Sequence, residues 1–136
     1  MLHVTVRRLQ GTFSVDVSFS TNGTGVTALF GRSGAGKTSV INMIAGLLRP
    51  DEGTIRINGN VFFDSKAGVN IAPDKRRLGY IFQDARLFPH LSVKSNLTYG
   101  MNLVSPTDRY VNFDAVVELL GIEHLLNRRP RSEERL

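Results

Sequence analysis

The chain has 136 residues, of which 41% are hydrophobic and 21% are charged, and it contains no cysteine. This length fits one domain and is too short for two of full size. The missing cysteines exclude disulfide frameworks, thiol nucleophiles and cysteine-ligated zinc. The formal net charge of +5 points to a phosphate-bearing or polyanionic partner. No apolar run approaches the roughly 18 residues that a membrane-spanning helix needs.

The first part of the chain carries two kinds of hydrophobic pattern. Residues 2–6 and 13–19 alternate between apolar and polar side chains, which predicts an antiparallel pair of strands with a turn at 10–12. Residues 25–30 form a continuous apolar run, which is typical of a strand covered on both faces in a parallel sheet. Apolar residues at helical spacing then predict a helix over 37–48.

The second part of the chain alternates turns with shorter elements. Residues 55–61 predict a β-hairpin, because Asn-Gly at 58–59 suits a turn whose two central residues both need a positive φ. The apolar run at 78–82 predicts another strand. A serine that can cap a helix opens the segment 92–99, and a second helical pattern covers 113–120.

A glycine-rich loop between the apolar run and the first predicted helix matches GxxxxGK[ST] at every fixed position. Its residues are Gly31, Arg32, Ser33, Gly34, Ala35, Gly36, Lys37 and Thr38, followed by Ser39. Glycines at this spacing let successive backbone N–H groups point at phosphate oxygens, and the helix directs its positive end at the same anion. We expect Lys37 to reach the β- and γ-phosphates, Thr38 to hold Mg²⁺, and Ser39 to reach the α-phosphate.

Longer stretches of the sequence resemble one family. The segments GRSGAGKTS, INMIAGLLRPDEGTIRING and KRRLGYIFQDARLFPHLSV resemble the ATP-binding subunit of ABC transporters. The segment QDARLFPHLSVKSNLTYGM is most similar to the molybdate-importer branch of that family. The resemblance extends from about Val4 to Ser132. It implies an α/β fold, namely an incomplete P-loop NTPase core of the ABC type with an antiparallel β portion at the amino terminus, and it implies ATP and Mg²⁺ as cofactors.

The same resemblance assigns roles beyond the loop. It makes Gln83 the glutamine that contacts Mg²⁺ and the attacking water in catalysis, and it directs the loop from Asp84 to His90 at a membrane permease. A second ATP-binding subunit, as in the homodimers of the intact family, would complete the site. We therefore expect a cytoplasmic protein that is peripheral on the inner face of the membrane. Residues 1–127 would form the amino-terminal part of the ATP-binding domain, and 128–136 a divergent charged tail.

Phe13 has two possible roles. The family stacks adenine on an aromatic residue in this region, and Phe13 is the aromatic residue within reach. Phe13 also continues the alternating apolar pattern of residues 13–19, which favours a place in the core over base stacking.

Two family motifs are absent from these 136 residues. Neither an LSGGQ-type signature nor an apolar strand that ends in Asp-Glu occurs in the sequence. The nearest imitation, at 61–64, continues with Ser65 where the glutamate should stand, and we interpret it as hairpin strand and loop. The expectation is a chain that represents the amino-terminal portion of such a subunit, binds nucleotide weakly and does not hydrolyse it alone.

Other functions are also compatible with the sequence. The chain could belong to an ABC ATPase that serves another substrate, because substrate choice lies outside this subunit, or it could be a non-catalytic fragment that binds nucleotide or permease. A nucleic-acid-binding module is disfavoured. The paired arginines at 7–8 and 76–77 are dispersed and are not interleaved with aromatic residues, so we expect no nucleic acid as partner.

Overall fold

The computed structural model describes residues 1–84 and 86–130. The chain divides into two compact units, Met1–Ile81 and Phe82–Leu136. Most of the charged tail predicted at 128–136, including Ser132, lies outside the described residues.

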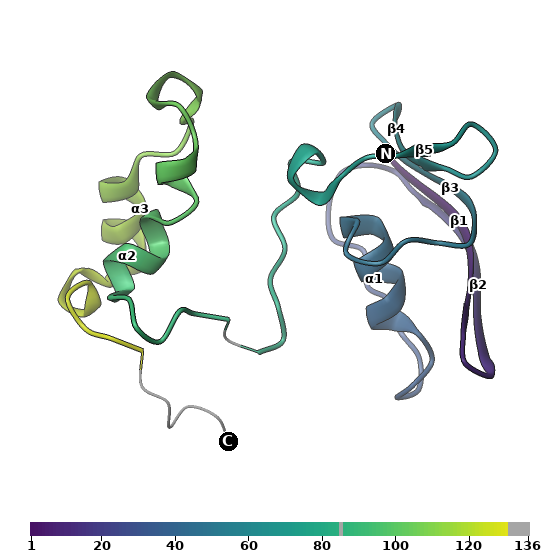
Figure 1. Ribbon diagram of the computed structural model, residues 1–136, viewed down its shortest axis with the longest axis horizontal. Coiled ribbons are helices and arrows are strands. Elements are labelled where there is room, and N and C mark those ends of the chain that lie inside the picture. The colour runs from purple at the N-terminus through teal and green to yellow at the C-terminus, as the bar shows by residue number, and fades with distance from the viewer. Residues whose placement is uncertain (85, 131–136) are drawn as a thin grey trace. The chain divides into compact units, whose positions relative to one another are not determined.

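The first unit is built on a five-stranded antiparallel sheet in the order β2-β1-β3-β4-β5 (Figure 1). The strands are β1 (Leu2–Gln10), β2 (Phe13–Thr21), β3 (Glu52–Ile57), β4 (Asn60–Asp64) and β5 (Val69–Asn70). The predicted antiparallel portion at the amino terminus is thereby confirmed.

Two tight turns set the register of this sheet. Gln10 pairs with Phe13 across the turn between β1 and β2. Asn58 and Gly59 both have a positive φ, of 49° and 83°, which is the conformation that a two-residue turn of this kind requires. The hairpin predicted from Asn-Gly is therefore correct, and residues 61–64 belong to its second strand, β4, as we had interpreted them.

The helix α1 spans Lys37–Ala45 and is shorter than the predicted 37–48. Gly46 adopts a left-handed conformation with φ 84°, and its N–H donates to the carbonyls of the last helical turn. A glycine in this conformation ends a helix because it has no Cβ to resist a positive φ. A 3-10 turn at Pro73–Lys75 follows the sheet.

The core of the first unit lies between α1 and one face of the sheet (Figure 1). Its buried residues come from four strands and the helix: Val4, Val6, Val15, Val40, Met43, Ile55 and Phe63. Ile41, one of the apolar residues at helical spacing, is half-exposed, whereas Met43 is completely buried. The helix therefore contributes Val40 and Met43, one turn apart, to the core.

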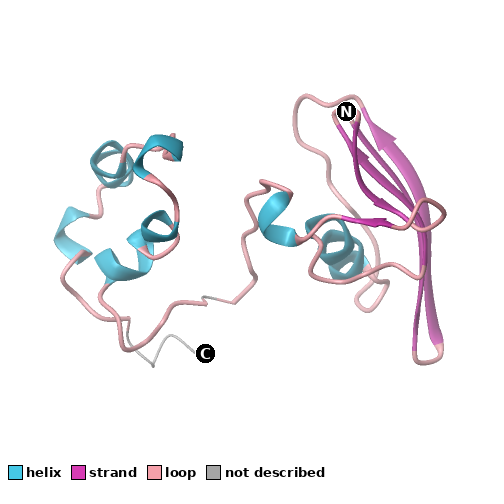
Figure 2. Cartoon of the chain, turned by 45° about the horizontal axis from the view of Figure 1, so that its top comes forward, coloured by secondary structure: helices cyan, strands magenta, loops and turns pink. Residues whose placement is uncertain are grey.

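The strands predicted at 25–30 and 78–82 are not formed, and both segments are drawn as loop in Figure 2. Val26, Phe30 and Ile81 are almost fully exposed to solvent. An apolar run becomes a strand only when neighbouring strands satisfy its N–H and C=O groups, and no strand among the described residues pairs with either segment.

The described residues of the second unit form two α-helices and several short 3-10 turns. α2 spans Val93–Thr98 and α3 spans Phe113–Leu120, as the sequence predicts. Ser92 caps α2 by accepting a hydrogen bond from the N–H of Ser95, and Asn112 caps α3 in the same way. The 3-10 turns lie at Met101–Leu103, Pro106–Asp108 and Glu123–Leu125. Within the described ranges, no helix is long and apolar enough to cross a membrane.

Gly53 tests whether the close approach of β3 to β1 determines stability. A Cβ at this position would lie 1.9 Å from the carbonyl oxygen of Thr5, and φ is +116°. Gly53→Ala is expected to destabilise the chain by about 3 kcal/mol or more, because backbone strain and overpacking add. Urea unfolding followed by circular dichroism measures the effect.

Gly59→Ala is the matched control. Gly59 also has a positive φ, but a Cβ there would meet no atom within 4 Å. Its expected cost is about 1–2 kcal/mol, from backbone strain alone. Equal losses in the two variants would contradict the close packing of β1 on β3.

Candidate functional site

Residues 31–36 form a loop that runs directly into the N-terminal end of α1, and residues 37–39 are the first residues of that helix. Gly34 and Gly36 have positive φ angles of 79° and 85°, and Gly36 is the residue immediately before the helix. Side chains with a Cβ rarely adopt these angles. The two glycines thus allow the backbone to curl, which is how successive N–H groups come to face a common anion.

The side chain of Lys37 folds back across this loop. Its Nζ donates to the carbonyl oxygens of Gly31, at 2.7 Å, and Arg32, at 2.8 Å. The N–H of Ala35 donates to the same Arg32 carbonyl at 3.2 Å. An ammonium group carries three donors, so two of them hold the loop closed and a third can serve a ligand.

The N-terminal end of α1 carries no negative charge of its own. Gly36, at the cap position, offers no side-chain acceptor, and the first turn contains no acidic residue. Unpaired N–H groups and the helix dipole at such an end favour an anion. The hydroxyl of Thr38 lies on an exposed residue in this turn. Ser39 donates from Oγ to Oε1 of Gln10 at 3.0 Å, a contact that the sequence did not indicate.

Phe13 lies beside this loop and outside the core. A Cβ built on Gly36 would lie 2.8 Å from Cγ2 of Val15 and 3.3 Å from the ring of Phe13. Val15 is buried, whereas Phe13 is 43% exposed. The core role that the alternating pattern favoured for Phe13 is therefore wrong, because the pattern of buried residues begins at Val15. The ring instead borders the glycine-rich loop.

Gln83 is exposed and belongs to the second unit, whereas the glycine-rich loop belongs to the first. The contact of Gln83 with Mg²⁺ and water stays a prediction.

The loop that follows Gln83 is held by α2. Asn96 accepts a hydrogen bond from the N–H of Phe88, at 2.7 Å, and donates back to the Phe88 carbonyl at 3.1 Å. The Phe88 ring lies 4.8 Å from that of Tyr99 and 5.9 Å, edge-on, from that of His90. The part of the segment 84–90 that the structure describes, which leaves out residue 85, is thus shaped by one asparagine and a small aromatic cluster.

The acidic residues that the structure describes do not form a metal centre. Among these residues, no group of three His, Asp or Glu side chains could hold an ion. Asp64 accepts hydrogen bonds from the N–H groups of Lys66 and Ala67, both at 3.0 Å. This carboxylate therefore stabilises the turn after β4, in agreement with the interpretation of 61–64 as hairpin.

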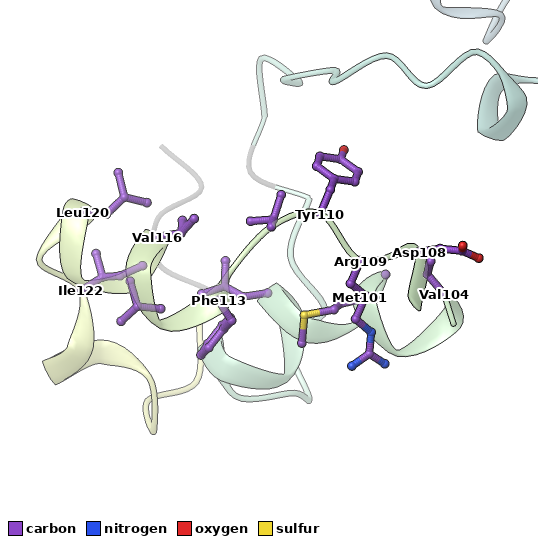
Figure 3. Close-up of a pocket in the computed structure, with 13 residues that line it drawn as sticks. Met101, Val104, Asp108, Arg109, Tyr110, Phe113, Val116, Leu120 and Ile122 are labelled. Atoms are coloured by element: carbon purple, nitrogen blue, oxygen red, sulfur yellow. The ribbon is translucent and has the colours of Figure 1, made fainter. Parts of the chain in front are cut away.

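An apolar cavity of about 330 Å³ lies in the second unit. Figure 3 shows side chains of Phe113, Val116, Leu120 and Ile122 lining it, with Asp108 and Arg109 among its few charged residues. A site for a phosphate ester needs several convergent donors. The glycine-rich loop meets that requirement and this cavity does not.

A family model and several curated proteins are similar to this chain in sequence. The family model described as "ABC transporter" matches residues 15–136. A molybdenum import ATP-binding protein, ModC, of Paramagnetospirillum magneticum is 60% identical over 130 residues, covering 96% of this chain and 36% of the relative. ModC of Mesorhizobium japonicum is 54% identical over 120 residues, covering 88% of this chain and 32% of the relative. The chain spans about a third of the length of these curated relatives.

Solved structures support the fold. The ATP-binding cassette MJ0796, in a dimeric post-hydrolysis state bound to ADP and Pi, superposes with a TM-score of 0.68 at 21% identity. That match covers 96% of this chain and 62% of the solved chain. MJ1267, an ATP-binding cassette of an ABC transporter, gives the same TM-score at 23% identity, covering 94% and 56%. The fold is therefore that of an ABC-type ATP-binding cassette, present in part.

Gly36 provides a test of how tightly the loop is seated on β2. Gly36→Ala places a Cβ against Val15 and also strains the backbone. Gly34→Ala strains the backbone equally but meets no atom within 4 Å. Gly36→Ala is expected to lower Tm about twice as far as Gly34→Ala, because overpacking of about 1–3 kcal/mol adds to a strain of about 1–2 kcal/mol. Equal melting temperatures for the two variants would contradict this seating.

Proposed function

The chain belongs to the ABC transporter family, and we propose that it forms the phosphate-binding part of an ATP-binding subunit. The observation that carries this proposal is the loop at 31–39, which combines two positive-φ glycines, a lysine folded over the loop and the N-terminal end of α1. These features supply donors and positive charge at one place, as polyphosphate binding requires.

The residues of the loop have distinct roles in this proposal. Backbone N–H groups from Arg32 to Thr38 surround the β- and γ-phosphates, and the third donor of the Lys37 ammonium reaches the same oxygens. Thr38, which is exposed in the first turn of α1, would give its hydroxyl oxygen to Mg²⁺. Ser39 would have to turn its hydroxyl from Gln10 to the α-phosphate.

Two further residues complete the proposed nucleotide site. Phe13 is half-exposed beside Gly36, which suits an aromatic ring that stacks on adenine. Gln83 would approach Mg²⁺ and the attacking water through its amide oxygen, which can coordinate a metal or accept a hydrogen bond. Its exposure in the loop after Ile81 leaves it accessible for this role.

For the whole protein we propose ATP-driven import of molybdate or a related oxyanion. The names of the ModC relatives support this substrate, and an ABC ATPase for another substrate is the alternative. The subunit would pair with a second ATP-binding subunit, as in the dimeric MJ0796 structure, at the cytoplasmic face of the membrane. The segment from Asp84 to His90 would contact the permease, because it presents the rings of Phe88 and His90, and Asn96 holds the backbone of Phe88 in place.

The 136-residue chain by itself is proposed to bind ATP without turning it over. Hydrolysis needs carboxylates that anchor Mg²⁺ and orient water. The described residues hold no acidic cluster fit for a metal ion, and Asp64 is engaged in a turn. Binding without chemistry is what the loop alone can support.

Lys37→Ala tests the proposed phosphate site. Loss of the ammonium is expected to weaken binding of a fluorescent ATP analogue with Mg²⁺ roughly 10- to 100-fold, because a hydrogen bond to a charged group contributes about 1.5–3 kcal/mol. Lys66→Ala, which removes an exposed lysine, is the matched control and should bind like the unsubstituted chain. Equal affinities for all three proteins would refute the phosphate role of Lys37.

The absence of turnover is tested in the same preparation. Release of phosphate from ATP by the purified chain is expected to match the rate without protein. Steady hydrolysis that Lys37→Ala abolishes would contradict the proposed division between binding and chemistry.

A further inference from the structure

Arg76 is a buried cation that no carboxylate among the described residues neutralises. Its side chain belongs to a residue that is 3% exposed, and the ion pairs of the described residues do not include it. Burial lowers the pKa of Arg76 from its ordinary value. A buried charge is costly unless hydrogen bonds satisfy it, so the neighbours of this guanidinium must supply acceptors.

Those acceptors come from the C-terminal end of α1, from the last residue of β5 and from the residue that follows it. Nη1 donates to the carbonyl oxygens of Met43, at 2.9 Å, and Ile44, at 2.7 Å. Nε donates to the carbonyl of Ile71 at 2.8 Å, and Nη2 to Oδ1 of Asn70 at 3.3 Å. The carbonyl end of a helix carries partial negative charge. Arg76 therefore binds α1 at the end opposite the glycine-rich loop.

The surroundings of Arg76 are shaped to admit its side chain. A Cβ on Gly46 would lie 2.7 Å from Nε and 2.9 Å from Cζ, so the glycine that ends α1 also makes room for the guanidinium. The Phe62 ring lies 5.7 Å from Cζ and adds a cation–π contact. The cation is thus enclosed by the helix end, the chain after β5 and an aromatic ring.

The chain after Arg76 leads toward Gln83 and is tied to α1 a second time. Arg77 has a positive φ of 51°, an unfavourable conformation for a residue with a side chain, and it is exposed while Arg76 is buried. Tyr80 donates from its hydroxyl to Oδ1 of Asn42 at 2.6 Å. Because residues 78–81 belong to no strand, side-chain contacts rather than a β-ladder connect them to the helix.

We propose that Arg76 is a positioning residue that, with Tyr80, makes the segment leading to Gln83 respond to nucleotide bound at the opposite end of α1. This inference rests on the proposed nucleotide binding by residues 31–39. The helix is the common element: its N-terminal end faces the phosphates, and its C-terminal turn holds Arg76. The segment 78–81 moves together with α1 because Arg76 and Tyr80, four residues apart, both bind to the helix.

Nuclear magnetic resonance titration of the full 136-residue chain with Mg·ATP tests the proposal. Amide signals of residues 31–39 report binding, and those of 78–81 report the response. In the unsubstituted chain both sets are expected to shift with the same midpoint. In Arg76→Met the signals of 31–39 should still shift, while the shifts at 78–81 are lost. Arg77→Met removes the same charge from the exposed neighbour and should keep both responses.

The outcomes separate this inference from the proposed function. No shift in either set for the unsubstituted chain would overturn both. Shifts at 31–39 without shifts at 78–81, or an undiminished response in Arg76→Met, would overturn the positioning role alone. If Arg76→Met does not fold, Tyr80→Phe tests the inference instead, because it removes only the hydroxyl that binds Asn42. A reduced response at 78–81 with unchanged binding would support the inference, and a full response would overturn it.

Discussion

The packing of α1 against the antiparallel sheet is the constraint on which the first unit depends. Val40 and Met43 insert among buried side chains of β1 to β4, and this burial is the main source of stabilisation for a helix of only nine residues. Fixing the helix axis also fixes both of its ends. The N-terminal end receives the glycine-rich loop, which rests on Val15 through Gly36, and the C-terminal end receives the Arg76 guanidinium. The phosphate site and its connection to the rest of the chain thus depend on one helix.

Local rules predicted the elements whose causes are local. The Asn58-Gly59 turn, the Ser92 cap and the spacing of apolar residues each determine structure within a few residues, and the corresponding elements form. The apolar runs at 25–30 and 78–82 could not be assigned in this way, because a strand exists only with partners that lie elsewhere in the chain. Val26, Phe30 and Ile81 of these runs remain almost fully exposed. The helix face was only partly predictable, since Met43 is buried in the core and Ile41 is half-exposed.

In the candidate site, too, the features with local causes could be predicted and those that depend on distant residues could not. The glycine-rich loop could be predicted because the spacing of its residues follows from its backbone geometry. Glycine stands where φ is positive, and lysine stands where the helix begins. The position of Phe13 could not be predicted, because the alternation of apolar and polar residues does not show where along β2 the core begins. Gln10 and Arg76 escaped detection for another reason. Their contacts with Ser39 and Met43 join residues 29 and 33 positions apart, and no local pattern records such a pairing.

Calorimetric titration of the chain with Mg·ATP, inorganic tripolyphosphate and AMP tests the central claim most directly, namely that residues 31–39 form a working cradle for a chain of phosphates. Backbone N–H groups and the Lys37 ammonium recognise the β- and γ-phosphates rather than the base. The account predicts that ATP and tripolyphosphate bind and compete with each other, and that AMP, which lacks both of these phosphates, binds far more weakly. Equal affinity for AMP and ATP, or no binding of either polyphosphate, would contradict it.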